Sequence, residues 1–304
     1  MQTFNPKEIP TGQFHSFMLG AIAPRPIAFA STIDNEGNVN LSPFSFFNCF
    51  GSNPPILIFS PARRVRDNTG KHTLDNVLDT GEVVINIANY AIVEQMSLAS
   101  TEYDKGVNEF VKAGLTPVAS TLVKPPRVAE APVAFECKVV EVKSMGEKGG
   151  AANLVICEAI LLHVKDEVFD TSGKTIDPVK LDAVARLGGD WYLRTTPDCL
   201  FELPKSLQNK GIGIDQLPEH IRNSSVLTGN NLARLGNTAI LPTEAEVHEF
   251  MQDPMYRYLI QAHQHNPAEA ERQIHLLAKK LLEEGHVHDA WKALLTLTLE
   301  KKAN

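Results

Sequence analysis

The chain has 304 residues, 43% of them hydrophobic, and 29 basic against 36 acidic side chains give a formal net charge of −7. This length and hydrophobic content suffice for one large domain or two ordinary ones. The acidic balance argues against a nucleic-acid partner, because binding a phosphate backbone requires massed Lys and Arg. The first residues resemble no signal peptide and no segment is long and apolar enough for a membrane span, so we expect a cytoplasmic protein without a membrane partner.

The first two thirds of the chain are typical of a β protein. Short runs rich in Val, Ile and Phe alternate with Gly, Pro and Asn. The predicted strands lie in residues 25–34, 35–47, 54–61, 82–89, 133–145 and 153–169, with a Gly-rich hairpin loop between the last two. Short connections between at least six strands predict an antiparallel barrel or sandwich. Two helices are expected on its outside, in residues 89–100 and 106–114.

The remainder of the chain has a helical pattern. Asn266 is a candidate N-cap, Pro267 suits the first helical position, and Gly285 marks the end of that helix. A second amphipathic helix is expected in residues 288–302. We therefore predict a β domain of residues 1–205 and an α-helical extension of residues 206–304. The extension packs within a dimer, or it covers the active site or recruits a partner.

One short polar segment, "RRVRDNTGKHTLDN" at 63–76, carries four fixed cations: Arg63, Arg64, Arg66 and Lys71. Thr73 is the expected N-cap of a short helix that Gly81 ends. The cations would then lie just before a helix N-terminus, which favours an anion such as a phosphate monoester. The alternative is a solvated surface loop, since most charge runs are solvated and the spacing is not that of a P-loop.

Several motifs occur together in order. They are "PRPIAFASTIDNEGNVNLSPFSFFNCFGSNPPILIFSP", "KHT" with Asn76, "TGEVVINI", and "RLGGDWY" at 186–192. Over about residues 10 to 200 the chain thus resembles the flavin reductase-like, FMN-binding split-barrel family, which includes reductase components of two-component monooxygenases and flavoredoxins. The resemblance implies a six-stranded antiparallel Greek-key split β-barrel with peripheral helices. It also implies a homodimer with FMN bound near the subunit interface.

The resemblance implies cofactor-binding residues in four short segments. They are Ser31 and Thr32; Ser45, Asn48, Cys49 and Phe50; Lys71, His72 and Thr73; and Arg186. The first two segments would line the flavin ring, and the third would bind its phosphate, although His72 stands where the family usually has Asp. Without the resemblance, segment 42–53 is better interpreted as a core strand with aromatic packing.

Other motifs have simpler interpretations. The four cysteines, Cys49, Cys137, Cys157 and Cys199, are scattered and are expected to be reduced, packed thiols. The loop "GEKGGAAN" at 146–153 is expected to be a mobile hairpin loop, with a lid over the flavin as the alternative. The histidine pairs of the helical region, at 263 with 265 and 286 with 288, are interpreted as surface residues, and no metal is predicted.

Two functions remain open at this point. The first is an NAD(P)H-dependent flavin reductase, in which NADH or NADPH passes a hydride to FMN and the reduced flavin serves an oxygenase partner. Placement of the two rings carries that chemistry, so no catalytic side chain is assigned. The second is a flavoredoxin-like electron-transfer protein that holds FMN without a nicotinamide site of its own.

Overall fold

The computed structural model describes residues 1–203 and 210–303. The chain divides into two compact units, Met1–Phe201 and Glu202–Asn304. The predicted domain boundary, between residues 205 and 206, lies outside the described residues. In the described part of the chain, no helix combines the length and apolarity that crossing a membrane requires.

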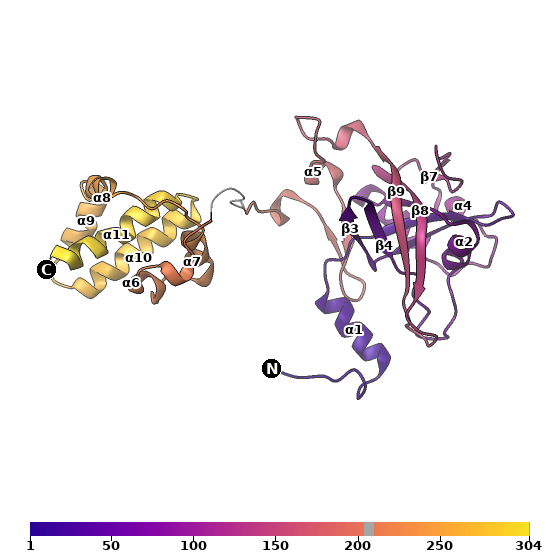
Figure 1. Ribbon diagram of the computed structural model, residues 1–304, viewed down its shortest axis with the longest axis horizontal. Coiled ribbons are helices and arrows are strands. Elements are labelled where there is room, and N and C mark those ends of the chain that lie inside the picture. The colour runs from indigo at the N-terminus through magenta and orange to yellow at the C-terminus, as the bar shows by residue number, and fades with distance from the viewer. Residues whose placement is uncertain (204–209, 304) are drawn as a thin grey trace. The chain divides into compact units, whose positions relative to one another are not determined.

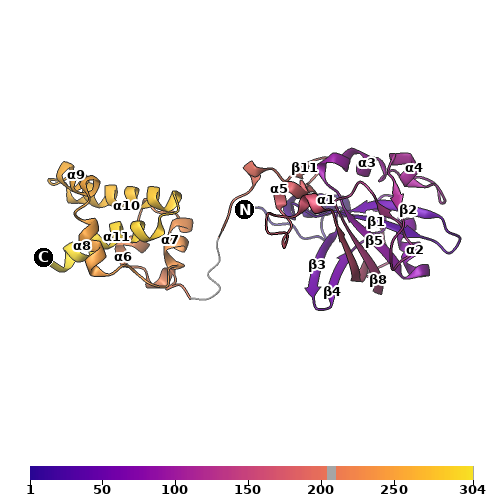
Figure 2. The same ribbon diagram turned by 90° about the horizontal axis from the view of Figure 1, so that it is seen from above.

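The first unit is built on one antiparallel sheet of seven strands, in the order β2-β1-β5-β8-β9-β4-β3 (Figures 1 and 2). The strands are β1 (Ala28–Ile33), β2 (Val39–Phe44), β3 (Phe47–Ser52), β4 (Pro55–Phe59), β5 (Glu82–Ile87), β8 (Val133–Ser144) and β9 (Asn153–Val164). All six predicted strand segments form strands. The predicted count of six is wrong, because residues 47–52 add an edge strand. The barrel is not closed, since the two edges, β2 and β3, do not pair.

Short helices and two small sheets surround the main sheet. The helices are α1 (Thr11–Ala21), α2 (His72–Thr80), α3 (Val93–Leu98), α4 (Glu109–Ala113) and α5 (Pro178–Leu181). The small sheets pair β6 (Pro117–Val118) with β7 (Arg127–Val128) and β10 (Val184–Arg186) with β11 (Tyr192–Arg194). Short 3-10 turns cover Tyr90–Ile92, Asp166–Val168 and Pro197–Cys199. Both helices predicted outside the sheet are confirmed by α3 and α4, whereas α1 was not predicted.

The main sheet has a hydrophobic core on each face, because side chains alternate along a strand. On β1, Ala28 and Ala30 belong to the cluster that packs under α2, which includes Leu74. Phe29 points the other way, into the cluster that includes Phe110 of α4. Helix α2 is therefore fixed over β1 by its apolar face, and its N-terminus is held at the end of that strand.

Two cysteines fulfil the packed-thiol prediction and two do not. Cys137 and Cys157 lie in the core, and burial raises the pKa of Cys137 to about 12. Cys49 and Cys199 are exposed. The prediction is wrong for Cys49 because β3 is an edge strand whose residues after Phe47 are all exposed.

The second unit is helical throughout its described residues. After a 3-10 turn (Ile214–Gln216) its helices are α6 (Glu219–Arg222), α7 (Gly229–Gly236), α8 (Glu244–Phe250), α9 (Pro254–Ala262), α10 (Pro267–Glu283) and α11 (Val287–Ala303). Helices α10 and α11 lie side by side (Figures 1 and 2) and bury Trp291 completely. The predicted N-cap is confirmed, since the Asn266 side chain accepts the Glu269 N–H at 3.2 Å. Gly285, with φ of +87°, follows the end of α10.

Candidate functional site

The cationic segment leads directly into α2, as expected, but the helix begins two residues earlier than predicted. Lys71 occupies the N-cap position without a side-chain capping bond, and α2 starts at His72. Thr73 is buried in the first turn, where its hydroxyl accepts a hydrogen bond of 2.8 Å from Nδ2 of Asn40. The prediction of Thr73 as N-cap is therefore wrong, because a side chain of β2 holds the hydroxyl inward. Gly81 ends the helix as predicted, with φ of +65°.

A cleft opens at the N-terminus of α2, between β2 and the residues that follow α3. Its lining includes Asn40, Ser42, Arg64, Lys71, His72, Thr73, Glu102 and Glu109. The structure thus brings together all three residues of the predicted phosphate motif. Asn40, Ser42, Glu102 and Glu109 come from other segments, and no local motif in the sequence pointed to them.

Lys71 differs from the other cations of its segment. Its side chain is half-buried, and within the described residues it forms no salt bridge. Burial, followed by the nearby Arg64 guanidinium, lowers the pKa of the Lys71 ammonium below its usual value. The carboxylates of Glu102 and Asp67 act on it in the opposite direction but only in part. A cation that is partly removed from water and forms no salt bridge gains when an anion binds beside it.

The arginines of the segment already have partners. Arg64 and Arg66 both contact the carboxylate of Glu102, at 2.5 Å from Nε and 3.0 Å from Nη2 respectively. Arg63 donates to the side chain of Asn68 at 2.7 Å. The expectation that all four cations are available to an anion is therefore met only by Lys71 in this structure.

The tip of the β8–β9 hairpin supports the cationic segment. The Arg63 N–H donates to the carbonyl of Ala151 at 2.9 Å, and the Gly150 N–H donates to the carbonyl of Arg63 at 3.0 Å. At Gly149 an added Cβ would lie 3.0 Å from the carbonyl oxygens of Arg64 and Val65. The Gly-rich loop therefore packs against the backbone of the cationic segment, which a bulkier residue at Gly149 would displace.

Ser31 and Thr32 lie on opposite faces of β1, since they are consecutive strand residues. Thr32 faces α2, where Nδ2 of Asn76 donates to its hydroxyl at 3.1 Å. Ser31 is fully buried, and its hydroxyl has no hydrogen-bond partner among the described residues. The structure therefore brings Thr32 to the helix that carries the phosphate motif, but not Ser31.

Ser45 and Arg186 both form hydrogen bonds with Arg25, a residue that the sequence analysis did not predict. The guanidinium of Arg25, 6% exposed, donates to the Ser45 hydroxyl at 3.4 Å and to the carbonyls of Ile22 and Leu187 at 2.9 and 3.0 Å. Backbone hydrogen bonds of 2.9 Å join Arg25 to Arg186 in both directions. Arg25 thus links α1, the end of β2 and strand β10. No local pattern shows this, because Arg25 reaches the carbonyl of Leu187 across 162 residues of sequence.

Asn48, Cys49 and Phe50 lie on the exposed edge strand β3. Its pairing with β4 is irregular between Cys49 and Gly51, at the position of Phe50, whose side chain is 65% exposed. The alternative interpretation of segment 42–53 as a core strand is therefore wrong for β3, whereas it holds for Phe44 of β2, which is buried and packs against Phe59. The three residues are exposed on the edge strand opposite β2 in the sheet order, and none of them lines the α2 cleft.

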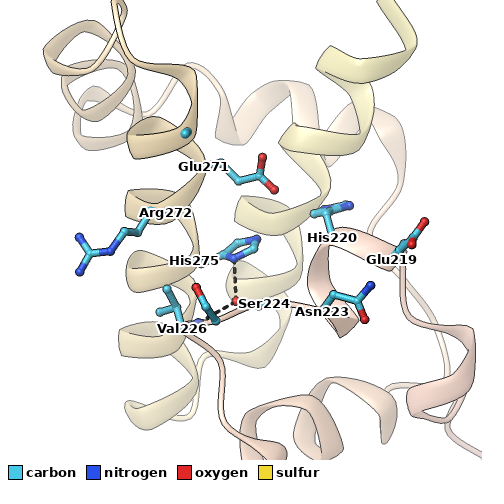
Figure 3. A pocket seen from close by; sticks show the side chains of 10 residues that line it. Glu219, His220, Asn223, Ser224, Val226, Glu271, Arg272 and His275 are labelled. Carbon is cyan, nitrogen blue, oxygen red and sulfur yellow. Dashed lines mark hydrogen bonds between the residues drawn. The ribbon is translucent and has the colours of Figure 1, made fainter.

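A second, larger cleft lies in the helical unit, between α6 with the loop that follows it and α10 (Figure 3). The Ser224 hydroxyl is 2.8 Å from Nδ1 of His275 and accepts the N–H groups of Val226 and Leu227 at 3.1 and 3.2 Å. His220 stacks on His275 with ring centroids 6.2 Å apart. The polar atoms of Ser224 are thus occupied in holding the loop to the helix.

Comparison with known proteins places the first unit in a family. The profile of the flavin reductase like domain matches residues 19–177. An uncharacterized protein of Aquifex aeolicus is 39% identical over 193 residues, which are 64% of this chain and 95% of that protein.

Solved structures show the same relationship. Nitrilotriacetate monooxygenase component B from Bacillus cereus is 29% identical, with a TM-score of 0.62 over 67% of this chain and 98% of that one. A Shewanella frigidimarina protein with a split barrel domain is 30% identical, with a TM-score of 0.58 over 68% and 100% of the two chains. The chain therefore belongs to the flavin reductase like family, which implies a flavin as cofactor or substrate.

The charges at the α2 cleft are of the kind that an anionic group such as a phosphate requires. Lys71 is the N-cap residue of α2, and its half-buried ammonium forms no salt bridge among the described residues, a combination that suits a dianionic phosphate. The flat ring has a different requirement, namely an apolar surface with nearby backbone donors. Among the exposed residues of β3, Phe50 presents an aromatic ring at the irregularity of the strand.

Proposed function

We propose that the protein is an NAD(P)H-dependent flavin reductase that takes FMN as its flavin. A bound flavin supplies a ring that accepts a hydride from the nicotinamide. The chain itself binds and orients: Lys71 and the start of α2 hold the phosphate, Thr73 is locked by Asn40, and residues 45–50 support the ring. The single observation that carries the proposal is the half-buried, unpaired ammonium of Lys71 inside the matched family region.

The same proposal includes a homodimer that completes the site. Helix α1 has no buried residue, and β3 exposes Asn48 to Ser52 as well as an open strand edge. Exposed aromatic side chains on an unpaired edge invite a protein partner. A second copy of this chain, seated on β3, would cover the ring-binding surface and exclude water from one side of it.

A cytoplasmic oxygenase that uses the reduced flavin is the proposed consumer, because component B of nitrilotriacetate monooxygenase is among the similar structures. For the helical unit we propose a separate domain, residues 206–304, that packs within the dimer. The oxygenase partner and the role of the helical unit are proposed in addition to the reductase assignment, and that assignment does not depend on either of them.

The test is direct. Purified protein is mixed with FMN and either NADH or NADPH, and loss of the reduced nicotinamide absorbance is followed. We expect acceleration with at least one nucleotide, and retention of FMN that inorganic phosphate weakens. No acceleration with either nucleotide would contradict the reductase. If FMN binds but only a reduced partner protein reduces it, the electron-carrier function replaces the proposed one.

A further inference from the structure

Glu102 occupies a position in the α2 cleft that the flavin reductase assignment does not explain. Its carboxylate bridges Arg64 and Arg66, with one oxygen 2.5 Å from Nε of Arg64 and the other 3.0 Å from Nη2 of Arg66. It lines the same cleft as Lys71, from the segment that follows α3. Arg66 also donates a hydrogen bond to this carboxylate, whereas the carboxylate's contact with Arg64 is an ion pair. A carboxylate held between two guanidinium groups occupies charges that a phosphate would use.

The bridge has little to contribute to folding. The Glu102 side chain is 44% exposed, that of Arg66 is 75% exposed and that of Arg64 is 20% exposed. The pair with Arg66 contributes little to stability at such exposure, because water and salt screen it. Arg64 also has uncharged partners, the Thr69 hydroxyl at 2.5 Å and the Gly70 carbonyl at 2.9 Å, that hold it in place without Glu102. We therefore expect Glu102 to affect the binding of a ligand in the cleft more than the stability of the fold.

We propose that Glu102 is a built-in competitor of the flavin phosphate, which lowers FMN affinity so that the flavin exchanges as a substrate. This inference rests on the proposed function. A phosphate bound at Lys71 either displaces the carboxylate from Arg64 or stays beside a like charge, and both outcomes weaken binding. Riboflavin, which lacks the phosphate, does not meet this competition.

The test is Glu102→Gln, which keeps the shape of the side chain and removes its charge. We expect FMN to bind about three- to tenfold more tightly and to dissociate more slowly, because one repulsive charge near the phosphate is gone. Riboflavin affinity should not change. Glu94→Gln is the matched control: Glu94 is an exposed acid on the neighbouring helix α3 that does not line the cleft, so FMN affinity should stay as in the wild type.

Two outcomes would overturn the role of Glu102. Unchanged FMN affinity would mean that the carboxylate and the phosphate do not share the cleft. Weaker FMN binding, with an unchanged melting temperature, would mean that Glu102 orients Arg64 toward the phosphate as a positioning residue. A melting temperature measured for each variant separates both outcomes from a folding defect.

Failure of the proposed function gives a different pattern. If Lys71→Ala weakens FMN but Glu102→Gln leaves it unchanged, only the competitor proposal fails. If the wild type binds FMN no better than riboflavin and inorganic phosphate does not displace it, the phosphate site itself is absent and both proposals fail. Binding of FMN, riboflavin and inorganic phosphate to the wild type therefore shows whether the phosphate site exists before the Glu102 variant is interpreted.

Discussion

The cleft of the helical unit and the cleft at α2 differ in size and in chemistry. Volume would select the first as the ligand site, whereas charge selects the second. The cleft of the helical unit has a volume of about 680 Å³, whereas the cleft at α2 has about 20 Å³. In the larger cleft, Ser224 is fully engaged with His275 and its own loop. In the smaller one, Lys71 is a half-buried cation without a salt bridge in the described residues. Unsatisfied charge, more than volume, marks the proposed ligand site.

Among the variants that test the comparison of the two clefts, Lys71→Ala should change FMN affinity most. Losing one charge-assisted contact should weaken FMN binding by about 1.5 to 3 kcal/mol, or roughly ten- to a hundredfold. Flavin fluorescence titrations with FMN and with riboflavin measure the difference. Riboflavin should be indifferent, and Arg272→Ala in the larger cleft should leave FMN affinity unchanged. Equal losses for FMN and riboflavin would mean that Lys71 does not touch the phosphate.

Raising the pH should weaken FMN binding gradually, as Lys71→Ala does at once, because the Lys71 ammonium loses its charge. The pKa of Lys71 lies below its usual value in the folded protein, so the ammonium deprotonates before a free lysine does. Above about pH 7 the phosphate stays a dianion, so falling FMN affinity at alkaline pH reports the lysine. The Kd for FMN should rise with increasing pH in the wild type. In Lys71→Arg it should depend less on pH, because the guanidinium stays charged. A flat wild-type profile would exclude Lys71 from the site.

The same lowered pKa has an effect of fixed sign on stability. Between the folded and unfolded pKa values the unfolded chain binds more protons, so stability rises with pH in that window. Below the folded pKa the ammonium therefore destabilises the flavin-free protein. Chemical denaturation near neutral pH should show that Lys71→Met is at least as stable as the wild type, although it binds FMN poorly. A clear loss of stability would mean that Lys71 serves the fold.

In the larger cleft, Ser224→Ala should affect stability and not flavin binding. The hydroxyl contacts His275 and accepts two loop N–H groups, so its loss should lower the free energy of unfolding of the helical unit by about 1 to 2 kcal/mol. Ser225→Ala, at an exposed neighbour, is the control. Chemical denaturation followed by Trp291 fluorescence measures both. A change in FMN affinity without a change in stability would overturn the distinction between the clefts.

The smallest effect is expected at the hairpin tip. Gly149→Ala places a Cβ 3.0 Å from the carbonyls of Arg64 and Val65, so the cationic segment must shift by a few tenths of an ångström. Strain of this kind costs about 1 kcal/mol or less, and FMN affinity should fall about two- to fivefold. Gly12→Ala, where the added Cβ meets nothing within 4 Å, is the control. Unchanged affinity would mean that the hairpin does not set the position of the segment.

Local patterns in the sequence predicted the elements whose own residues decide their structure. The β-branched strand Val83–Ile85 and the capped helix after Asn266 are of this kind. Strand β3 was missed because its exposed residues do not alternate, and α1 because none of its residues is buried. In β3 only Phe47 packs against the core, and α1 has no buried residue, so burial in a single chain imposes no periodic pattern on either element.

The site was predictable only where neighbours in sequence form it. Lys71, His72 and Thr73 were found together because one helix start carries them. Asn40 redirects the Thr73 hydroxyl, and Glu102 neutralises Arg64, from segments some thirty residues away along the chain. Such partnerships depend on how strands and helices meet in space, and no spacing rule within one segment contains that information.

The anchoring of Arg25 sets a lower limit on the autonomous folding unit. The family region ends at residue 177, yet the Arg25 guanidinium and backbone are held by the carbonyls of Leu187 and Arg186. A fragment cut at the end of the family region would leave a buried cation facing a void where those acceptors stood. Truncated versions of this protein should therefore retain at least the β10–β11 ribbon if they are to refold and be studied alone.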